Sequence, residues 1–197
     1  FKEGDDKDPA DYRPICLLPI LYKVFRKILC ERIGLFLDAA QTVDQAGFRK
    51  GYSCEDHLFT AAQLAEKATE YRMPLWMVVV DFKKAFDCVE HEALWTAMRE
   101  QGLPEKYVRI VKDLYKEQRG KVAADAVSRE FSIGRGTKQG DPMSPKLFNA
   151  ALQAVFAKLV AKWEEEGAGL EMTQERRLTN LRFADDALLV AGSEEVL

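Results

Sequence analysis

Two adjacent carboxylates, Asp185 and Asp186, stand near the end of the chain. They interrupt two short β-like segments within the run 181–190, so we expect them at a hairpin turn. Two like charges side by side repel each other, and a cation would relieve that repulsion. Mg²⁺ prefers such oxygen ligands. Asp is also a common turn residue for local hydrogen-bonding reasons, so the pair indicates a metal site only if a third carboxylate joins it.

Asp81 is the candidate for that third carboxylate. It ends the apolar run Leu75–Val80, whose valine-rich composition is typical of a strand buried on both faces. A residue at the end of such a strand has a rigid backbone, which suits a metal ligand. The alternative is an Asp that caps the following turn. The motifs that surround Asp81 and Asp185 must therefore distinguish a metal ligand from a turn residue.

Helices and strands follow one another irregularly along the chain. Ser53 followed by Asp56 has the form of a capping box and predicts a helix to about residue 71. Two further helix starts carry similar signals: Asp87 with Glu90, and Ser144 with Pro145. Other expected elements are helices at about 21–37 and 104–116, two strands within 119–133, and the hairpin around Asp185. This order predicts an α+β domain.

Composition limits the possible classes of protein. The chain has 197 residues, 47% of them hydrophobic, and no apolar run long enough to span a bilayer, so we expect no membrane partner. It begins with Phe1 rather than Met, which suggests a fragment. Its four cysteines show no C-x-x-C spacing and are interpreted as reduced thiols of an intracellular protein.

Charge gives a mixed indication about nucleic acid. The net charge of −3 argues mildly against binding through bulk electrostatics. Lys and Arg exceed Asp and Glu within 13–50 and within 103–140, so local basic faces could follow phosphates. The alternative interpretation of both segments is a set of solvated helix faces.

Five motifs occur in the order that is typical of a known family, and together they favour the functional interpretation of these residues over the structural one. The family's motif A is matched by Asp81-Phe82-x-x-Ala85-Phe86-Asp87, motif B by 139–149, beginning Gln139-Gly140-Asp141, and motif C by Phe183-Ala184-Asp185-Asp186. The segments Tyr12-Arg13-Pro14-Ile15 and 45–51, Gln-Ala-Gly-Phe-Arg-Lys-Gly, look like the fingers motifs of non-LTR (LINE-type) enzymes. The chain thus resembles the reverse transcriptase domain of non-LTR retrotransposons. Group II intron and telomerase relatives share the palm, but the 45–51 pattern points to the LINE-type branch.

The resemblance implies a right-hand polymerase palm, an antiparallel sheet with flanking helices, plus fingers, with the thumb absent. Residues 1–11 would be an acidic lead-in, 12–74 the fingers, and 75–197 the palm, truncated after motif C. Some fingers elements could lie between 103 and 136. The implied activity is RNA-directed DNA polymerisation, a nucleotidyl transfer that adds dNTPs to a primer 3′-OH with two Mg²⁺ ions, or Mn²⁺ in their place.

Site residues follow from the same resemblance. Asp81, Asp185 and Asp186 would be catalytic and would bind metal, with the backbone carbonyl of Phe82 as a further ligand. Phe86 would exclude a ribose 2′-OH, although an ordinary core position remains the alternative. Nucleotide contacts are expected at Arg13, Lys23, Phe82, Phe86, Gln139 and Gly140, with Arg26 as a further candidate from spacing. Arg49 and Lys50 are candidates for the template backbone, whereas Asp87 is interpreted as a helix cap and His57 and His91 as structural residues.

The implied partners are an RNA template, a DNA or RNA primer and dNTPs, and the oligomeric state stays open. Location would be intracellular, with no basis for separating the nucleus from a cytoplasmic ribonucleoprotein. One rival hypothesis is a catalytically silent RNA-binding remnant of a mobile element. Another is a viral RNA-directed RNA polymerase, but Phe86 and the Phe183-Ala184 pair count against it, because that family usually has Gly before its Asp pair.

Overall fold

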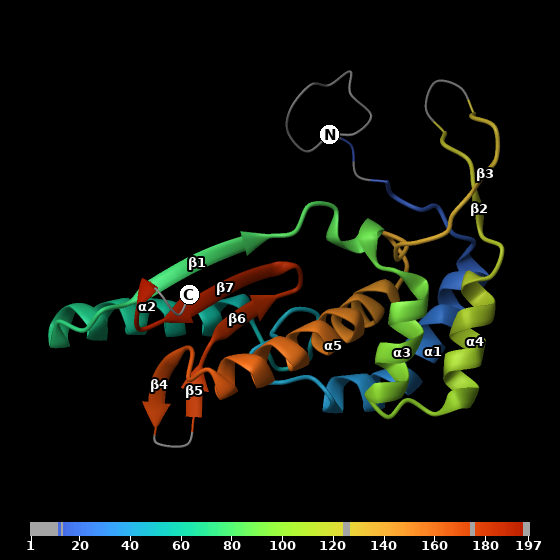
Figure 1. The fold of residues 1–197 in the computed structure, drawn as a ribbon. Helices are drawn as coiled ribbons and strands as arrows, with labels where there is room; N and C mark the ends of the chain where they lie inside the picture. The colour runs from blue at the N-terminus through green and yellow to red at the C-terminus, as the bar shows by residue number, and fades with distance from the viewer. Residues whose placement is uncertain (1–11, 13, 124–126, 174–175, 195–197) are drawn as a thin grey trace.

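The computed structural model describes residues 12, 14–123, 127–173 and 176–194, and Figure 1 shows their arrangement. Helices and strands are mixed along the chain, which confirms the predicted α+β class. The elements are α1 (Ile20–Ala39), α2 (Cys54–Tyr71), β1 (Trp76–Asp81), the 3₁₀ turn η2 (Ala85–Cys88), α3 (His91–Glu100), α4 (Glu105–Tyr115), β2 (Arg119–Gly120), β3 (Phe131–Ser132), α5 (Ser144–Glu165), β4 (Leu170–Thr173), β5 (Arg176–Leu178), β6 (Asn180–Phe183) and β7 (Asp186–Ala191).

The central sheet is antiparallel, with the strand order β1-β7-β6. Side chains alternate across β7, because successive residues of a strand point to opposite faces. Val190 and Leu188 pack with Leu64 of α2, whereas Ala187 and Leu189 pack with Phe148 and its neighbours on α5. Helices α2 and α5 therefore pack on opposite faces of β7, and α5 runs along the length of the sheet (Figure 1).

The largest apolar core lies beside the sheet, among α1, α3, α4 and α5. Figure 1 shows α1, α3 and α4 gathered at one end of α5. The buried members of this core include Ile33 of α1, Leu94 and Met98 of α3, Val108 of α4 and Leu147 of α5. This core fixes the position of the first turn of α5, and with it the motif B loop that precedes the helix.

Several local predictions are confirmed by the structure. Ser53 caps α2 in a reciprocal capping box with Asp56, and the helix ends at Tyr71 as expected. The expected helix at 21–37 is α1, and two short strands pair antiparallel within 119–133. All four cysteines are free.

Among the residues that the structure describes, no helix has the length and apolarity that a membrane span requires.

Two expectations about elements were wrong. β1 is not buried on both faces: it lies at the edge of the described sheet, and 76% of Val79 is exposed. Asp87 does not cap α3, because Glu90 is the residue that precedes this helix. Asp87 lies inside η2 instead. The carbonyls of Phe86 in η2 and of Val89 just after it accept hydrogen bonds from the backbone amides of Thr137 and Gly136, respectively.

The start of α5 also differs from the prediction. Ser144 is the first helical residue and Met143 occupies the cap position, so the helix begins one residue earlier than the Ser-Pro signal suggests. No side chain caps the helix, but Asp141 stabilises the turn just before it, because its Oδ1 accepts the Met143 backbone amide at 3.0 Å. After α5, the small β4–β5 hairpin was not expected from the sequence. The acidic lead-in 1–11 lies outside the described residues.

Candidate active site

The predicted metal-binding aspartates meet at one end of the sheet. In the antiparallel pair of β1 with β7, Asp81 lies opposite Asp186. Asp185 precedes Asp186 in the two-residue turn between Phe183 and Asp186. The hairpin places the motif C aspartates as expected, and the strand register brings the motif A aspartate beside them.

These side chains are open to solvent and to a ligand. Asp81 and Asp186 are exposed and Asp185 is half-buried. Within the described ranges, no Lys, Arg or His forms a salt bridge with any of the three. Three carboxylates form a donor set that suits a hard divalent cation. Among the described residues, no three His, Cys, Asp or Glu side chains are grouped as they would be in a formed metal site.

Phe86 lies between the aspartates and α5, where it belongs to an aromatic cluster. Its ring stacks on Phe148 with centroids 4.3 Å apart and meets the edge of Phe48 at 6.1 Å. The side chain is half-buried, so one part packs in the core and another is accessible. Core packing is therefore established for Phe86, and its role in sugar selection stays a prediction. Phe82 follows Asp81 and is 37% exposed.

The motif B loop is held by the segment before α1. The Cys16 backbone amide donates to the Gln139 carbonyl at 2.8 Å, and Ile15 and Gln139 form a parallel bridge. Gly140 has φ +94, and a Cβ there would lie 3.2 Å from the Cys16 carbonyl oxygen. Glycine suits this position because it adopts positive φ without strain. Arg13, the expected phosphate contact in this segment, lies outside the described residues.

Arg26 is a correction to the predicted phosphate contacts. Its guanidinium is fully buried and forms an ion pair with Asp141 of the motif B loop. It also donates to the Tyr115 hydroxyl at 3.3 Å. Spacing along α1 suggested a triphosphate contact, but the position faces inward onto α4 and motif B. Arg26 therefore anchors the loop that carries Gln139 and Gly140.

Other basic candidates fall into two groups. Arg49 was expected on the template, but its guanidinium binds the backbone carbonyls of Thr42, Gln45, Asp38 and Gln41, so it stabilises its own loop. Lys23 and Lys50 are exposed, and their phosphate contacts remain predictions. His57 and His91 each hydrogen-bond a backbone carbonyl, that of Asp44 and of Gly136, which agrees with structural roles.

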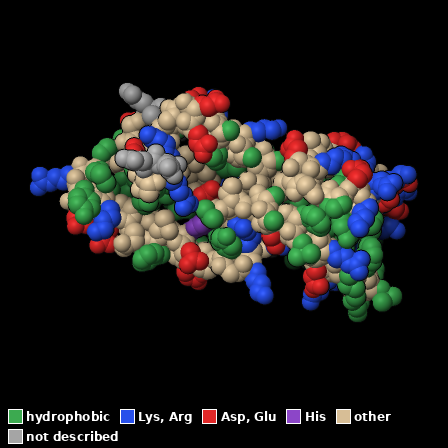
Figure 2. Space-filling model, turned by 90° about the horizontal axis from the view of Figure 1, so that it is seen from below, with side chains coloured by type: hydrophobic (Ala, Val, Ile, Leu, Met, Phe, Trp, Pro, Cys, Tyr) green, Lys and Arg blue, Asp and Glu red, His purple; other side chains and the backbone are tan. Residues whose placement is uncertain are grey.

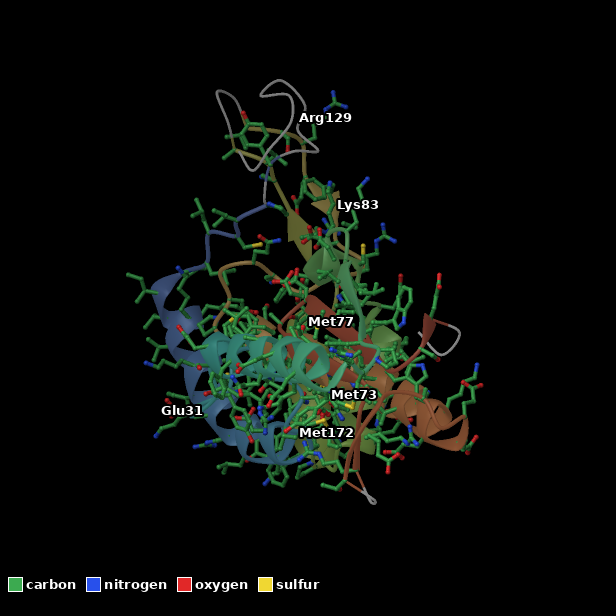
Figure 3. All side chains as sticks on the ribbon, turned by 90° about the vertical axis from the view of Figure 1, so that its left-hand side faces the viewer. Glu31, Met73, Met77, Lys83, Arg129 and Met172 are labelled. Carbon is green, nitrogen blue, oxygen red and sulfur yellow. The ribbon has the colours of Figure 1, made fainter. Side chains whose placement is uncertain are left out.

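Charge is mixed over the surface. Figure 2 shows acidic and basic side chains interspersed on one face, without a continuous basic track. Figure 3 labels two basic side chains, Lys83 just past the end of β1 and Arg129 next to β3, but Figure 1 shows the β2–β3 hairpin well away from the end of β1. Of these two residues, only Lys83, two residues after Asp81, therefore stands near the predicted catalytic end.

A family model for reverse transcriptase (RNA-dependent DNA polymerase) matches residues 2–197. The chain belongs to the reverse transcriptase family. It is 31% identical, over its whole length, to retrovirus-related Pol polyproteins of the R2 retrotransposable elements of Nasonia vitripennis and Popillia japonica. It spans 18% and 27% of those two proteins. These relatives confirm the predicted placement among reverse transcriptase domains of non-LTR elements.

Solved structures support the same fold. A Candida tropicalis telomerase in complex with a fragment of telomeric RNA matches with a TM-score of 0.64 and 13% identity, over 88% of this chain and 30% of that one. The telomerase of Candida albicans gives a TM-score of 0.59 at 12% identity, over 88% of this chain and 31% of that one. At this identity the likeness shows the reverse transcriptase fold alone. Reverse transcriptases in general depend on divalent metal ions.

Three polar residues of this reverse transcriptase domain escaped the sequence prediction, although each occurs within or beside a motif. Asp141 pairs with Arg26. Arg182 precedes motif C and is buried against Phe156, which lowers its pKa to about 10. Gln45 is fully buried and binds the backbone of the motif C turn. Each of these contacts joins positions more than 25 residues apart, so no local pattern could reveal it.

Proposed function

We propose that this chain is the fingers and palm of an RNA-directed DNA polymerase from a non-LTR retrotransposon-like element. In this proposal residues 12–74 belong to the fingers and 75–197 to the palm. The single observation that carries it is the strand register that sets Asp81 opposite Asp186, next to Asp185 in the turn. Polymerisation requires carboxylates from two separate motifs at one point, and this register supplies them.

The three aspartates would hold two Mg²⁺ ions, with the Phe82 carbonyl as a further ligand. Bound ions of this kind stabilise the entering and leaving oxygens of a phosphoryl transfer. The exposure of Asp81 and Asp186, and the absence of a salt bridge to either among the described residues, leave both carboxylates free for this role. Because the side chains do not form a ready-made cluster, we expect them to turn toward one another only when cations and a nucleotide bind.

Motifs A and B would together shape the nucleotide site. Phe86 is fixed by its stack on Phe148, so its accessible edge would meet the sugar at a defined place. Thr137 ties the motif B loop to motif A, because its backbone amide donates to the Phe86 carbonyl at 2.7 Å. Gln139 and Gly140 then face the same region, where they would contact the base pair. An RNA template, a primer and dNTPs are the proposed partners, and an intracellular location is proposed with them.

Primer extension on an RNA template tests the proposal. It should be run with Mg²⁺ on this chain and on a longer protein that adds the downstream residues of its relatives. Asp81→Ala and Asp185→Ala should each reduce extension by at least about 10²–10³-fold, the scale lost when one preorganised electrostatic contact is removed. Asp113→Ala is the matched control, because Asp113 is an exposed aspartate on α4.

Each outcome bears on the proposal. Retained extension in either aspartate variant would contradict the metal-binding assignment. A loss in Asp113→Ala as large as in Asp185→Ala would show that any lost carboxylate disturbs the domain. If neither the chain nor the longer protein extends a primer, the silent RNA-binding remnant would replace the polymerase.

A further inference from the structure

The turn that carries Asp185 is held by a side chain from another part of the chain. Ala184, the first residue of the turn, has φ +57 and is 5% exposed. Its backbone amide donates to Gln45 Oε1 at 2.9 Å, and its carbonyl accepts from Gln45 Nε2 at 3.2 Å. The side-chain amide thus pairs with both polar groups of one peptide residue. Among the side chains of the genetic code, only Asn and Gln offer an amide donor and acceptor in this geometry.

The loop around Gln45 follows the turn closely. The Asp44 backbone carbonyl accepts the Arg182 backbone amide at 2.7 Å, and the Ala46 backbone amide donates to the Arg182 carbonyl at 2.8 Å. A Cβ on Gly47 would overlap the backbone nitrogen of Ala184 and lie 2.8 Å from its Cα. Only glycine therefore fits at residue 47, and the loop lies against the aspartate turn as a backbone support.

Gln45 is itself fixed from two sides. Its Oε1 also accepts the Gly47 backbone amide at 2.8 Å, so rotation of the side chain would break three hydrogen bonds. The Gly47 carbonyl accepts Asn149 Nδ2 of α5 at 2.8 Å, and Asn149 is buried. Arg49 donates to the Gln45 carbonyl at 2.9 Å. The support thus reaches from α5 to the turn through fully or almost fully buried polar groups.

We propose that Gln45 is a positioning residue that sets the direction of the Asp185 carboxylate. The inference rests on the proposed function, because it assigns a role relative to the same aspartates. The pairing of Phe183 with Asp186 closes the turn, but without partners for its amide and carbonyl the Ala184 peptide could adopt other orientations within it. Because Gln45 binds both groups, the orientation of the Ala184 peptide is fixed. The Cα–Cβ bond of Asp185, the next residue, is thereby held in one direction relative to the sheet. A residue that orients a metal ligand from behind contributes to affinity and rate without touching either substrate or ion.

The test replaces Gln45 by Met, which keeps the length of the side chain and removes its donor and acceptor. The Ala184 amide should exchange with deuterium at least about 5-fold faster by NMR, since one ordinary hydrogen bond is lost. Titration with Mn²⁺ alone, followed by electron paramagnetic resonance, should show about 10- to 100-fold weaker binding, the usual effect of removing such a support. Primer extension should show a lower kcat with little change in KM for the dNTP.

Gln118→Met is the matched control. Gln118 is also buried and donates to a backbone carbonyl, that of Leu114 at 2.7 Å, but it has no contact with the turn. Its replacement should lower thermal stability through the loss of one buried hydrogen bond and leave Ala184 exchange and Mn²⁺ binding unchanged. Gln45→Glu keeps the acceptor for the Ala184 amide, so the slow exchange at that position should return.

The outcomes separate this inference from the proposed function. Unchanged Ala184 exchange and Mn²⁺ affinity in Gln45→Met would overturn the positioning role, even if Asp185→Ala abolishes extension. Equal changes in Gln118→Met would also overturn it, because general destabilisation would then be the cause. If Gln45→Met changes exchange and Mn²⁺ affinity but the unsubstituted protein never extends a primer, the positioning role stands and the polymerase proposal fails.

Discussion

The aspartates around the predicted nucleotide site differ in their exposure to solvent and in their partners. Asp81 and Asp186 lie exposed at the end of the sheet, without a salt bridge to any described residue. Asp141 lies in the motif B loop, 3% exposed, in contact with Arg26 and with the Met143 amide. A carboxylate whose charge is already neutralised inside the fold has no capacity left for a ligand. The comparison therefore separates aspartates that the fold uses from aspartates that it leaves for chemistry.

The buried and the exposed aspartates should also differ in their contribution to the free energy of unfolding. A buried ion pair is costly to break, because the remaining charge stays without water or a partner. An exposed carboxylate has most of its solvation intact, so its removal changes stability little. Asp141 should thus matter for folding and the sheet-end aspartates for activity. The four predictions below test this contrast.

The largest effect is expected from Asp141→Ala. This change leaves the Arg26 guanidinium buried without its carboxylate and should lower the free energy of unfolding by about 3–5 kcal/mol. Urea denaturation measures the loss. The double variant Arg26→Met with Asp141→Leu should recover most of it, since both charges are then gone. If Asp141→Ala unfolds at the same urea concentration as the unsubstituted chain, the ion pair does not support the loop.

Asp186→Asn should give the opposite pattern. Primer extension should fall by about 10²–10³-fold, because one carboxylate charge at the site is lost. The free energy of unfolding should change by less than about 0.5 kcal/mol, as for other exposed positions. Urea denaturation and extension assays on the same preparation measure both quantities. A large loss of stability with normal extension would place Asp186 with Asp141 and remove the contrast.

Phe86→Val should have a smaller and more selective effect. The loss of ring volume should reduce discrimination of dNTP against rNTP by at least about 10-fold, within the range that a change in pocket shape gives. Loss of the stack on Phe148 should also lower stability, by about 1–2 kcal/mol. Competition between the two nucleotides measures selectivity. Phe59→Val, at an exposed position on α2, is the control. An unchanged dNTP/rNTP discrimination in Phe86→Val would show that the Phe86 ring serves only in core packing.

The contrast also shows which features the sequence could predict. Ser53 with Asp56 predicted the start of α2, and the spaced motifs predicted that Asp81 and Asp185 meet, because these signals are local or belong to a family pattern. Arg26 looked like a surface cation because its partner lies 115 residues away. The role of Gln45 depends on a contact across 139 residues. Such pairs follow from how α1, α5 and the hairpin pack, which no single segment encodes.

Exposure of β1 has a similar explanation. The run Leu75–Val80 is apolar enough for a strand covered on both faces. Coverage depends on the neighbours of the strand, and in the described structure β1 pairs only with β7. A prediction from composition can indicate how much apolar surface a strand presents, but it cannot indicate which element covers that surface. For the same reason Asp87 looked like a cap, whereas contacts with the motif B loop hold it inside a 3₁₀ turn.

The smallest expected effect concerns Asp87, which is intermediate between the two kinds of aspartate. Burial raises its pKa above the usual 3.8, while the charge of Lys84 and a hydrogen bond from Gln139 oppose that shift. Burial raises the pKa of the nearby Cys16 thiol, Lys138 opposes that shift, and the charges of Asp141 and Asp87 add to it. Because the pKa of the Asp87 carboxyl is raised in the folded state, its protonation stabilises the fold. This contribution to the free energy of unfolding is complete below the unfolded-state pKa and is lost as pH rises through the folded-state pKa.

Asp87→Asn should therefore be slightly more stable than the unsubstituted chain at pH 7, where the native carboxylate is ionised against the cost of burial. Thermal unfolding across pH 3–7 measures the difference, which should shrink toward zero below about pH 4, where the carboxyl is protonated in both states. Asp113→Asn, at an exposed aspartate, should show no such trend. A less stable Asp87→Asn at pH 7 would mean that the hydrogen bond from Gln139 outweighs burial, and Asp87 would then join Asp141 among the aspartates that the fold uses.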